Sequence, residues 1–148
     1  MAEKAGLLIF LDFDGVLRRK EAPLHRFETP LLAVFEEAVR RIPDGEIVIT
    51  SSWREVIGLA ALRRLFSPDV AAKIVGVAPF GDHGRYGEIL AYLKETGAAG
   101  VRWVVVDDDP YGYPRDTPLI LVDPARGFGP EDARNWWRWV EGRRSLGG

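Results

Sequence analysis

Short apolar runs alternate with amphipathic stretches along the chain. Five of these runs predict strands buried in a sheet, because each is continuous and is closed by polar residues; they cover residues 7–11, 47–49, 74–77, 103–106 and 119–122. Segments with helical spacing of apolar residues lie between most of them. This alternation predicts an α/β fold, a three-layer sandwich with a mainly parallel five-stranded sheet between two layers of helices.

Capping signals and apolar spacing mark the expected helices. Thr29 is expected to cap a first helix that has Pro30 in its first turn. Residues 52–55 have the spacing of a capping box and predict a helix that runs to about Phe66. The spacing predicts two further helices, whose buried faces are Tyr86, Ile89, Leu90 and Leu93 in one and Ala133, Trp136, Trp137 and Val140 in the other.

Length and composition fit one soluble domain over residues 1–148, since no repeat, low-complexity segment or linker divides the 148 residues. The net charge of −2 gives no global field that would attract nucleic acid or a membrane surface. The absence of cysteine excludes disulfides and thiolate chemistry. The run at residues 7–11 is too short for a membrane span or a signal peptide, so we expect a cytoplasmic protein without a membrane partner. The oligomeric state stays open; Trp139 lies off the apolar face of the last helix and is expected to be exposed or in a dimer contact.

Polar residues follow directly where three of the predicted strands end. Asp12 and Asp14 follow the first strand, Thr50 and Ser51 follow the second, and residues 107–109, all aspartates, follow the fourth. Ligands of open α/β sheets bind beyond the carboxyl ends of the strands, so these groups are expected to converge on one site. Aspartate is also common in ordinary turns after strands. As an explanation of these residues, however, that would require the same coincidence at several strand ends.

The expected ligands at this site are all oxygens. Carboxylates gathered together repel one another unless a cation neutralises them, and an oxygen-only set without a histidine or cysteine cluster favours Mg²⁺. A magnesium site of this kind suits a phosphate, because the metal offsets the charge of the carboxylates and the phosphoryl oxygens. Asp12 and Asp14 face the same way in extended backbone, so one is able to attack while the other handles protons.

These motifs resemble the signatures of the haloacid dehalogenase-like (HAD) superfamily of phosphohydrolases. The first is an apolar strand followed by Asp12-Phe-Asp14-Gly-Val, the second an apolar strand ending in Thr50, and the fourth an apolar strand ending in Asp107-Asp108. The order and spacing agree over residues 7 to about 109. The resemblance implies a Rossmann-like sheet.

The resemblance also implies a two-step phosphoryl transfer. Asp12 would attack phosphorus to form an aspartyl-phosphate, and Asp14 would protonate the leaving oxygen and then activate water. Mg²⁺ would be held by the Asp12 carboxylate, the Asp14 carbonyl and Asp107, with Asp108 beside it. Phosphoryl oxygens would be bound by Thr50, with Ser51 adding a hydroxyl or backbone N–H nearby.

The third signature of the family, a lysine before the fourth strand, is absent in its usual form. Arg85 has the best placement for this function, and an arginine is able to bind phosphate in a bidentate manner. Lys73 is the alternative, although it precedes a strand. Asp109 is a further candidate metal ligand, or else a cap or an exposed turn residue.

No cap domain is expected over the site. Only 35 residues separate Asp14 from Thr50 and only 34 separate Thr50 from Arg85, and predicted elements fill much of both stretches. The resemblance then favours a large phosphorylated substrate, such as a nucleic-acid end, although a nucleotide or another small molecule is not excluded. The loop after Asp14 carries basic residues at 18–20 and again at 25 and 26; these either bind such an anion or form a solvated surface. A phosphate- and metal-binding regulatory module with little turnover is the alternative function.

Overall fold

The computed structural model describes residues 6–23 and 26–146, with the side chains described as far as residue 142. Its strands are β1 (Leu7–Leu11), β2 (Gly45–Ile49), β3 (Ile74–Val77), β4 (Trp103–Asp107) and β5 (Leu119–Leu121). Its helices are α1 (Thr29–Arg40), the 3-10 helix η1 (Ser52–Glu55), α2 (Leu59–Arg63), α3 (Pro68–Ala71), α4 (Gly84–Glu95) and α5 (Pro130–Leu146).

The five strands form one sheet in the order β3-β2-β1-β4-β5. Every neighbouring pair is parallel, so the mainly parallel sheet expected from the sequence is entirely parallel here. The order places β1 in the centre, and the chain first builds outward to β3 and then crosses back to β4. This is the strand order of a Rossmann-like fold, with its switch point between β1 and β4.

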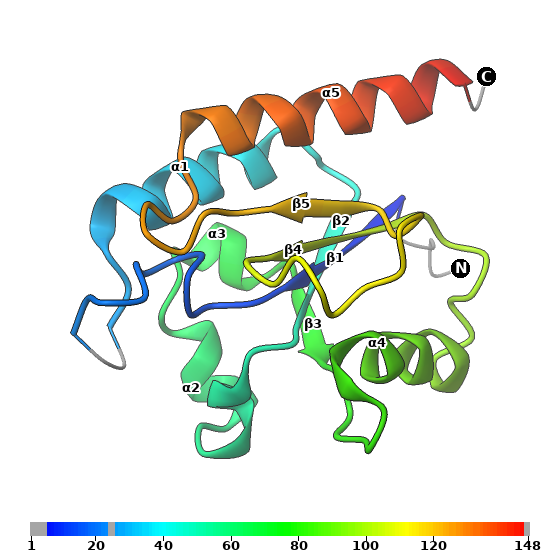
Figure 1. Cartoon of the computed structure of the whole chain (residues 1–148), viewed down its shortest axis with the longest axis horizontal. Helices are drawn as coiled ribbons and strands as arrows, with labels where there is room; N and C mark the ends of the chain where they lie inside the picture. The colour runs from blue at the N-terminus through cyan, green and yellow to red at the C-terminus, as the bar shows by residue number, and fades with distance from the viewer. Residues whose placement is uncertain (1–5, 24–25, 147–148) are drawn as a thin grey trace.

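Helices cover both faces of the sheet, as the sandwich prediction requires (Figure 1). Residues 7, 9 and 11 of β1 pack into a core with α1, α2, α3 and α5, whereas residues 8 and 10 pack on the other face with α4. The alternation follows from the twofold period of a strand, and all five residues of β1 are buried. Figure 1 shows α1 and α5 side by side on one face and α4 on the other.

The helix expected over residues 52–66 is wrong. The chain instead forms η1, breaks, and starts α2 only after Gly58, whose φ of −70° and ψ of 159° are extended. Ser51 caps η1 through a 3.2 Å hydrogen bond that its Oγ accepts from the Trp53 N–H. Trp53 lies in an aromatic cluster, with ring centroids 5.3 Å from both Phe13 and Phe27. Burial of this indole therefore overrides the local helical signal.

Three smaller expectations also differ from the structure. Glu28, not Thr29, is the N-cap of α1, and its side chain makes no capping hydrogen bond. Leu90 is 43% exposed because it points away from the buried face of α4. Trp139 is partly buried, with the Arg102 guanidinium 5.2 Å from its ring centroid.

None of the helices within the described residues is both long enough and apolar enough to cross a bilayer.

Candidate active site

The candidate site lies at the carboxyl ends of β1, β2 and β4, the three central strands. Backbone hydrogen bonds continue the sheet just past the strand ends: the Asp12 N–H donates to the Val106 carbonyl over 3.0 Å, and the Thr50 N–H donates to the Leu11 carbonyl over 2.9 Å. Asp12 and Thr50 are therefore held as firmly as strand residues although they stand at the edge of the sheet. This edge, beside the switch point, is where open α/β sheets bind ligands.

Three carboxylates gather at this edge. One oxygen each of Asp12, Asp107 and Asp108 lies within 4.8 Å of the others, and Asp12 and Asp107 are buried. The Asp107 side chain is fixed, since its Oδ1 accepts the Asp108 N–H at 2.7 Å and the Asp109 N–H at 3.2 Å. Its Oδ2 accepts the Tyr113 hydroxyl at 2.6 Å. These contacts orient one edge of the cluster before any ligand binds.

Burial and repulsion between carboxylates disfavour the charged form of Asp12 and Asp108. Burial, followed by the charge of Asp107, raises the pKa of Asp12 to about 8, although the neighbouring Arg85 lowers it. The pKa of Asp108 is also raised, first by burial. A bound divalent cation would relieve the repulsion between these carboxylates, and the oxygen donor set fits Mg²⁺.

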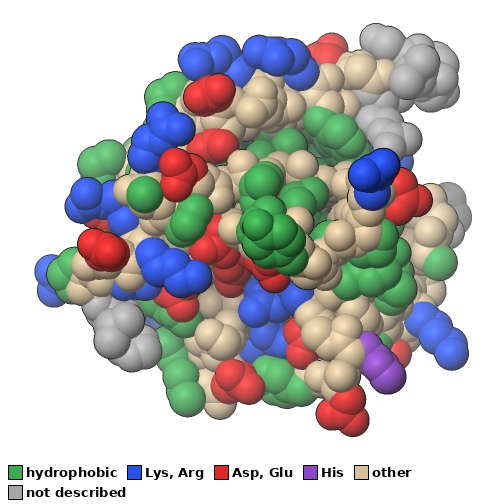
Figure 2. Space-filling model, viewed as in Figure 1, with side chains coloured by type: hydrophobic (Ala, Val, Ile, Leu, Met, Phe, Trp, Pro, Cys, Tyr) green, Lys and Arg blue, Asp and Glu red, His purple; other side chains and the backbone are tan. Residues whose placement is uncertain are grey.

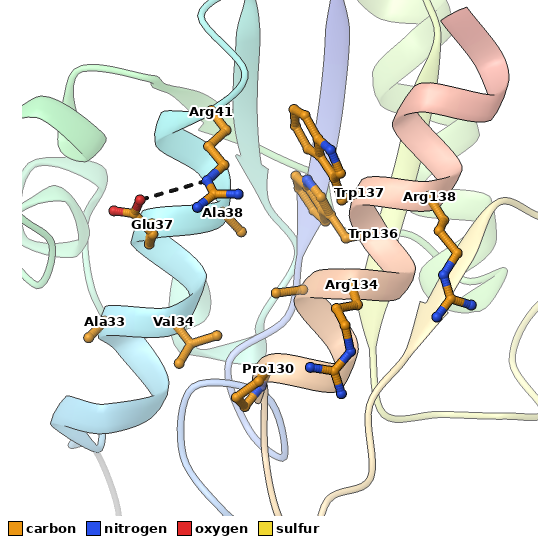
Figure 3. Close-up of a pocket in the computed structure, with 11 residues that line it drawn as sticks. Ala33, Val34, Glu37, Ala38, Arg41, Pro130, Arg134, Trp136, Trp137 and Arg138 are labelled. Atoms are coloured by element: carbon orange, nitrogen blue, oxygen red, sulfur yellow. Dashed lines mark ion pairs between the residues drawn. The ribbon is translucent and has the colours of Figure 1, made fainter. Parts of the chain in front are cut away.

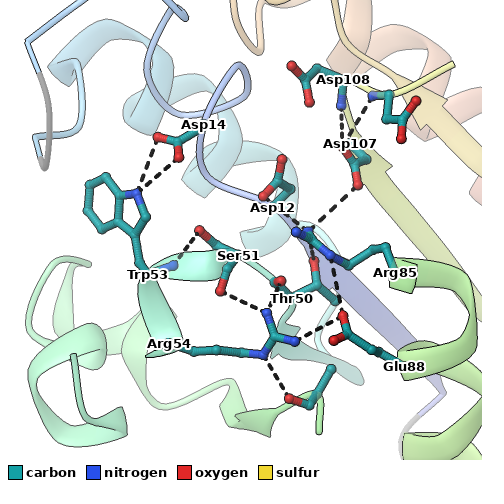
Figure 4. A network of polar contacts seen from close by, with 12 residues as sticks. Asp12, Asp14, Thr50, Ser51, Trp53, Arg54, Arg85, Glu88, Asp107 and Asp108 are labelled. Carbon is teal, nitrogen blue, oxygen red and sulfur yellow. Dashed lines mark hydrogen bonds and ion pairs between the residues drawn. The ribbon is translucent and has the colours of Figure 1, made fainter. Parts of the chain in front are cut away.

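Arg85 reaches the cluster from the first turn of α4 (Figure 4). Its Nη1 donates to Asp12 Oδ1 and to Thr50 Oγ1, each over 3.2 Å, and lies 3.8 Å from Asp107 Oδ2. Burial lowers the pKa of Arg85, but the charges of Asp12 and Asp107 outweigh it and the pKa is raised. The guanidinium thus remains charged between the nucleophile candidate and the threonine.

Glu88 forms ion pairs with both Arg85 and Arg54 on the side of Arg85 that faces away from Asp12. Glu88 lies one turn after Arg85, and its Oε1 is 3.6 Å from Arg85 Nε and 3.0 Å from Arg54 Nη2. Arg54, only 3% exposed, also donates to the carbonyls of Thr50 and Ser51. Figure 4 shows this chain of contacts running from η1 to α4 beneath the acids.

Asp14 lies to one side of the three acids. Its carboxylate accepts the Trp53 Nε1–H at 3.2 Å and Arg18 Nη1 at 2.9 Å, and Figure 4 shows it turned toward the indole. Directly after Asp14 the chain turns tightly, and Gly15 in this turn has a φ of 81°. A Cβ at Gly15 would lie 2.3 Å from Asp108 Oδ2, so glycine is required for this turn to pass the acid cluster.

The other candidates predicted from the sequence have different contacts, and not all of them reach the acid cluster. The Ser51 hydroxyl is buried and used as the cap of η1. Lys73 donates to the Ile42 carbonyl over 3.0 Å, beside the turn before β2. It therefore lies at the amino ends of the strands, whereas Asp12 lies at their carboxyl ends. Asp109 Oδ1 accepts the backbone N–H groups of residues 111 and 112, the role of a turn residue. Arg85 therefore reaches the acid cluster and Lys73 does not.

The basic loop at residues 18–20 is largely paired within the protein. Arg18 is 2% exposed and is bound by Asp14 and by carbonyls of its own loop. Arg19 forms a bidentate pair with Glu28, at 2.8 to 3.1 Å. Lys20 Nζ lies 3.5 Å from Asp108 Oδ2. His25, a further basic residue of the loop after Asp14, lies outside the described residues.

Four residues of the site were not foreseen from the sequence: Trp53, Arg54, Glu88 and Tyr113. Glu88 follows Arg85 at the i+3 spacing of a helical pair, a local signal that would have found it. The indole and phenol partners have no such signal. Trp53 reaches Asp14 from 39 residues away, and the contact of Tyr113 with Asp107 depends on the course of the turn after β4.

A separate hollow of about 650 Å³ lies between α1 and α5 (Figure 3). Apolar side chains such as Val34, Ala133 and Trp137 line it, with arginines at its rim. It contains none of the residues of the acid cluster. The converging polar chemistry of the described residues is thus at the strand ends and not in the more apolar hollow.

A comparison with models of known protein families gives a match. A family model described as "HAD domain in Swiss Army Knife RNA repair proteins" matches residues 8–133, which run from the second residue of β1 to beyond the end of β5 and include every residue of the acid cluster. Neither the curated proteins nor the solved structures contain a significant match to the chain. With the family model covering most of its length, the chain belongs to this family of HAD domains.

Proposed function

We propose that this protein is a Mg²⁺-dependent phosphomonoesterase that acts on nucleic-acid ends through an aspartyl-phosphate on Asp12. The observation that carries the proposal is the meeting of Asp12, Thr50 and Arg85 beside two further carboxylates. Membership of the HAD domains of RNA repair proteins supports a phosphohydrolase and favours a nucleic-acid end over other phosphates.

In the first step, an Asp12 oxygen attacks phosphorus while the bond between phosphorus and the leaving oxygen breaks. Asp14 gives its proton to that leaving oxygen. In the second step, water attacks the phosphorus of the aspartyl-phosphate, Asp14 accepts a proton from the water, and the bond to the Asp12 oxygen breaks. The Trp53 and Arg18 contacts hold the Asp14 carboxylate as a hydrogen-bond acceptor, which suits the second step.

Phosphoryl oxygens would accept hydrogen bonds from donors that bind other side chains of the site in this structure. Arg85 Nη1 is shared between Asp12 and Thr50, so an oxygen bound beside these residues would receive the same guanidinium and the threonine hydroxyl. Mg²⁺, bound by Asp12, the Asp14 carbonyl, Asp107 and Asp108, would supply charge neutralisation of the phosphoryl group.

Open access to the site is part of the proposal. Within the described residues, α1 and β2 follow Asp14, and short helices with β3 separate Thr50 from Arg85. Neither stretch contributes a separate cap fold in the part of the chain that is described. We infer that residues 1–148 act as one capless domain, which suits the end of a polymer better than a small enclosed metabolite.

The test is release of phosphate from 3′- and 5′-phosphorylated RNA with Mg²⁺, comparing the wild type with Asp12→Asn. An Arg19→Ala variant is the matched control, because it removes a charge of the loop and leaves the acid cluster intact. We expect hydrolysis by the wild type and the control, and its loss in Asp12→Asn. Equal activity of all three proteins would contradict the nucleophile assignment, and metal or phosphate binding without turnover would favour the regulatory alternative.

A further inference from the structure

The most exposed apolar side chains lie in connections after the carboxyl ends of strands, the side of the sheet that carries the proposed phosphate site. Among the described residues, the three most exposed large hydrophobic side chains are Tyr111 at 92%, Val56 at 77% and Phe80 at 58%. Each lies in a connection that follows the carboxyl end of a strand: β4, β2 and β3, respectively. The less exposed ones, Val75, Leu90 and Leu121, lie within strands or helices.

Isolated apolar residues on a surface are common, but a group beside a polar site is typical of ligand contacts. Figure 2 shows hydrophobic side chains standing out at the centre of one face, directly beside acidic and basic ones. In the same view, Figure 1 shows the β4–β5 connection crossing this region. The connection covers residues 108–118 and carries Tyr111.

Most of the cations near the nucleophile already have partners within the protein. Arg18 and Arg19 are engaged by Asp14 and Glu28, and Arg85 is engaged at the acids. The cations nearest the nucleophile are thus used to hold the loop and the phosphate position. Of the loop cations, Lys20 beside Asp108 is exposed and is able to contact a substrate, and apolar side chains would add contacts to the bases.

Both aromatic side chains are presented on fixed backbone. The Arg54 guanidinium lies 4.4 Å from the centroid of the Phe80 ring, and Arg54 itself is bound by the Ala78 carbonyl at 2.8 Å. One face of Phe80 is therefore supported while the ring stays more than half exposed. At Tyr111, the backbone N–H donates to Asp109 Oδ1 over 2.8 Å, which holds the turn that carries the ring.

We propose that Tyr111 and Phe80 are stacking platforms for the bases of a nucleic-acid strand whose terminal phosphate enters the site. This inference rests on the proposed phosphatase function and adds how the strand is bound. Aromatic stacking is tolerant of sequence because every base has a π face, so it suits a protein that acts on ends of different sequence. The strand would gain affinity from the rings, and phosphates without a base would not.

The experiment compares a short 3′- or 5′-phosphorylated RNA with glycerol phosphate, which carries no ring. We expect Tyr111→Ala to lower kcat/KM for the RNA by about 10- to 100-fold, mainly through KM, with a smaller loss for Phe80→Ala. Both variants should hydrolyse glycerol phosphate like the wild type. Tyr111→Phe keeps the ring and should retain RNA activity, and Leu90→Ala removes an exposed apolar group from α4 as a control.

Unchanged RNA kinetics in both alanine variants would overturn the inference, as would equal losses on RNA and glycerol phosphate. A second readout does not need turnover: anisotropy of labelled phosphorylated RNA with Asp12→Asn, alone and combined with Tyr111→Ala. Weaker binding of the double variant supports the platform, and equal binding contradicts it. Absence of hydrolysis of every phosphate would contradict only the phosphatase proposal, so the two failures are distinguishable.

Discussion

Two pairs of arginines in this protein follow strands of the sheet and differ in their partners. Arg18 and Arg19 follow the nucleophile candidate and bind Asp14 and Glu28, so their charges hold a loop together. Arg54 and Arg85 lie beneath the acid cluster, where Arg85 contacts Asp12 and Thr50 directly. The comparison teaches that a run of basic residues is a poor guide to substrate binding, because the partners of each cation decide its function.

The largest expected effect is at Arg85. Arg85→Ala should lower kcat about 10²- to 10³-fold, since it removes the guanidinium shared by the nucleophile and the phosphate position. Arg85→Lys keeps the charge without the fork and should recover part of the activity. Steady-state hydrolysis of phosphorylated RNA measures both. Activity of Arg85→Ala close to that of the wild type would remove the distinction between the two groups of arginine.

Glu88→Gln should have the next largest effect. It leaves the buried Arg54 guanidinium without its carboxylate, and we expect a loss of about 2 kcal/mol in the free energy of unfolding. It also loosens Arg85 and should lower kcat about tenfold, whereas Glu37→Gln, at an exposed pair on α1, should change neither quantity. Denaturant unfolding and kinetics test this, and normal kcat with reduced stability would assign Glu88 to folding alone.

The acid cluster itself should cost stability when no metal is bound. Because the pKa of Asp12 is raised from 3.8 to about 8, the folded state binds its proton more tightly than the unfolded state. The folded state therefore loses stability as the pH rises from about 4 to about 8, and Asp12→Asn escapes this loss. In EDTA, the variant should be more stable than the wild type by about 1–3 kcal/mol at pH 8, and by less at pH 5.

Thermal unfolding at the two pH values gives this difference directly. Addition of Mg²⁺ at pH 8 should stabilise the wild type more than Asp12→Asn, because the cation neutralises the carboxylates that repel one another. A variant less stable than the wild type throughout this range would contradict the electrostatic account.

The smallest effect is expected at Arg19. Its pair with Glu28 is exposed, so Arg19→Ala should keep hydrolysis of phosphorylated RNA within about twofold of the wild type. Raising the salt concentration should leave this small difference smaller still. A large loss of activity would show that the loop grips the substrate after all, as the sequence alone had allowed.

The fold could be predicted because its signals are local. Continuous apolar runs predicted the five strands, and the polar residues that close them predicted the position of Asp12, Thr50 and Asp107. The region after Ser51 could not be predicted in this way. There a capping-box pattern indicated a helix, but Trp53 turns into the aromatic cluster and its Nε1 binds Asp14, which is 39 residues away in the sequence.

The remaining parts of the site depend on the course of the loops and on contacts between elements. Tyr113 reaches Asp107 across the turn after β4, and Arg54 binds carbonyls after β2 and β3 together with Glu88 on α4. The family pattern favoured Arg85 over Lys73 as the cation before β4, and the position of α4 brings Arg85 into contact with Asp12 and Thr50. The polar residues that lie together at the strand ends can thus be predicted from the sequence. The side chains that hold them in place can be identified only once the fold is known.

The most direct test of the central claim is detection of the phosphoryl group on Asp12. The protein is mixed with phosphorylated RNA and Mg²⁺, quenched in acid within the first turnovers, digested and analysed by mass spectrometry. We expect one phosphoryl group on the peptide that contains Asp12, removed by hydroxylamine and absent from the Asp12→Asn variant. Hydrolysis by the wild type with no such adduct at any quench time, and with activity retained in Asp12→Asn, would contradict the account.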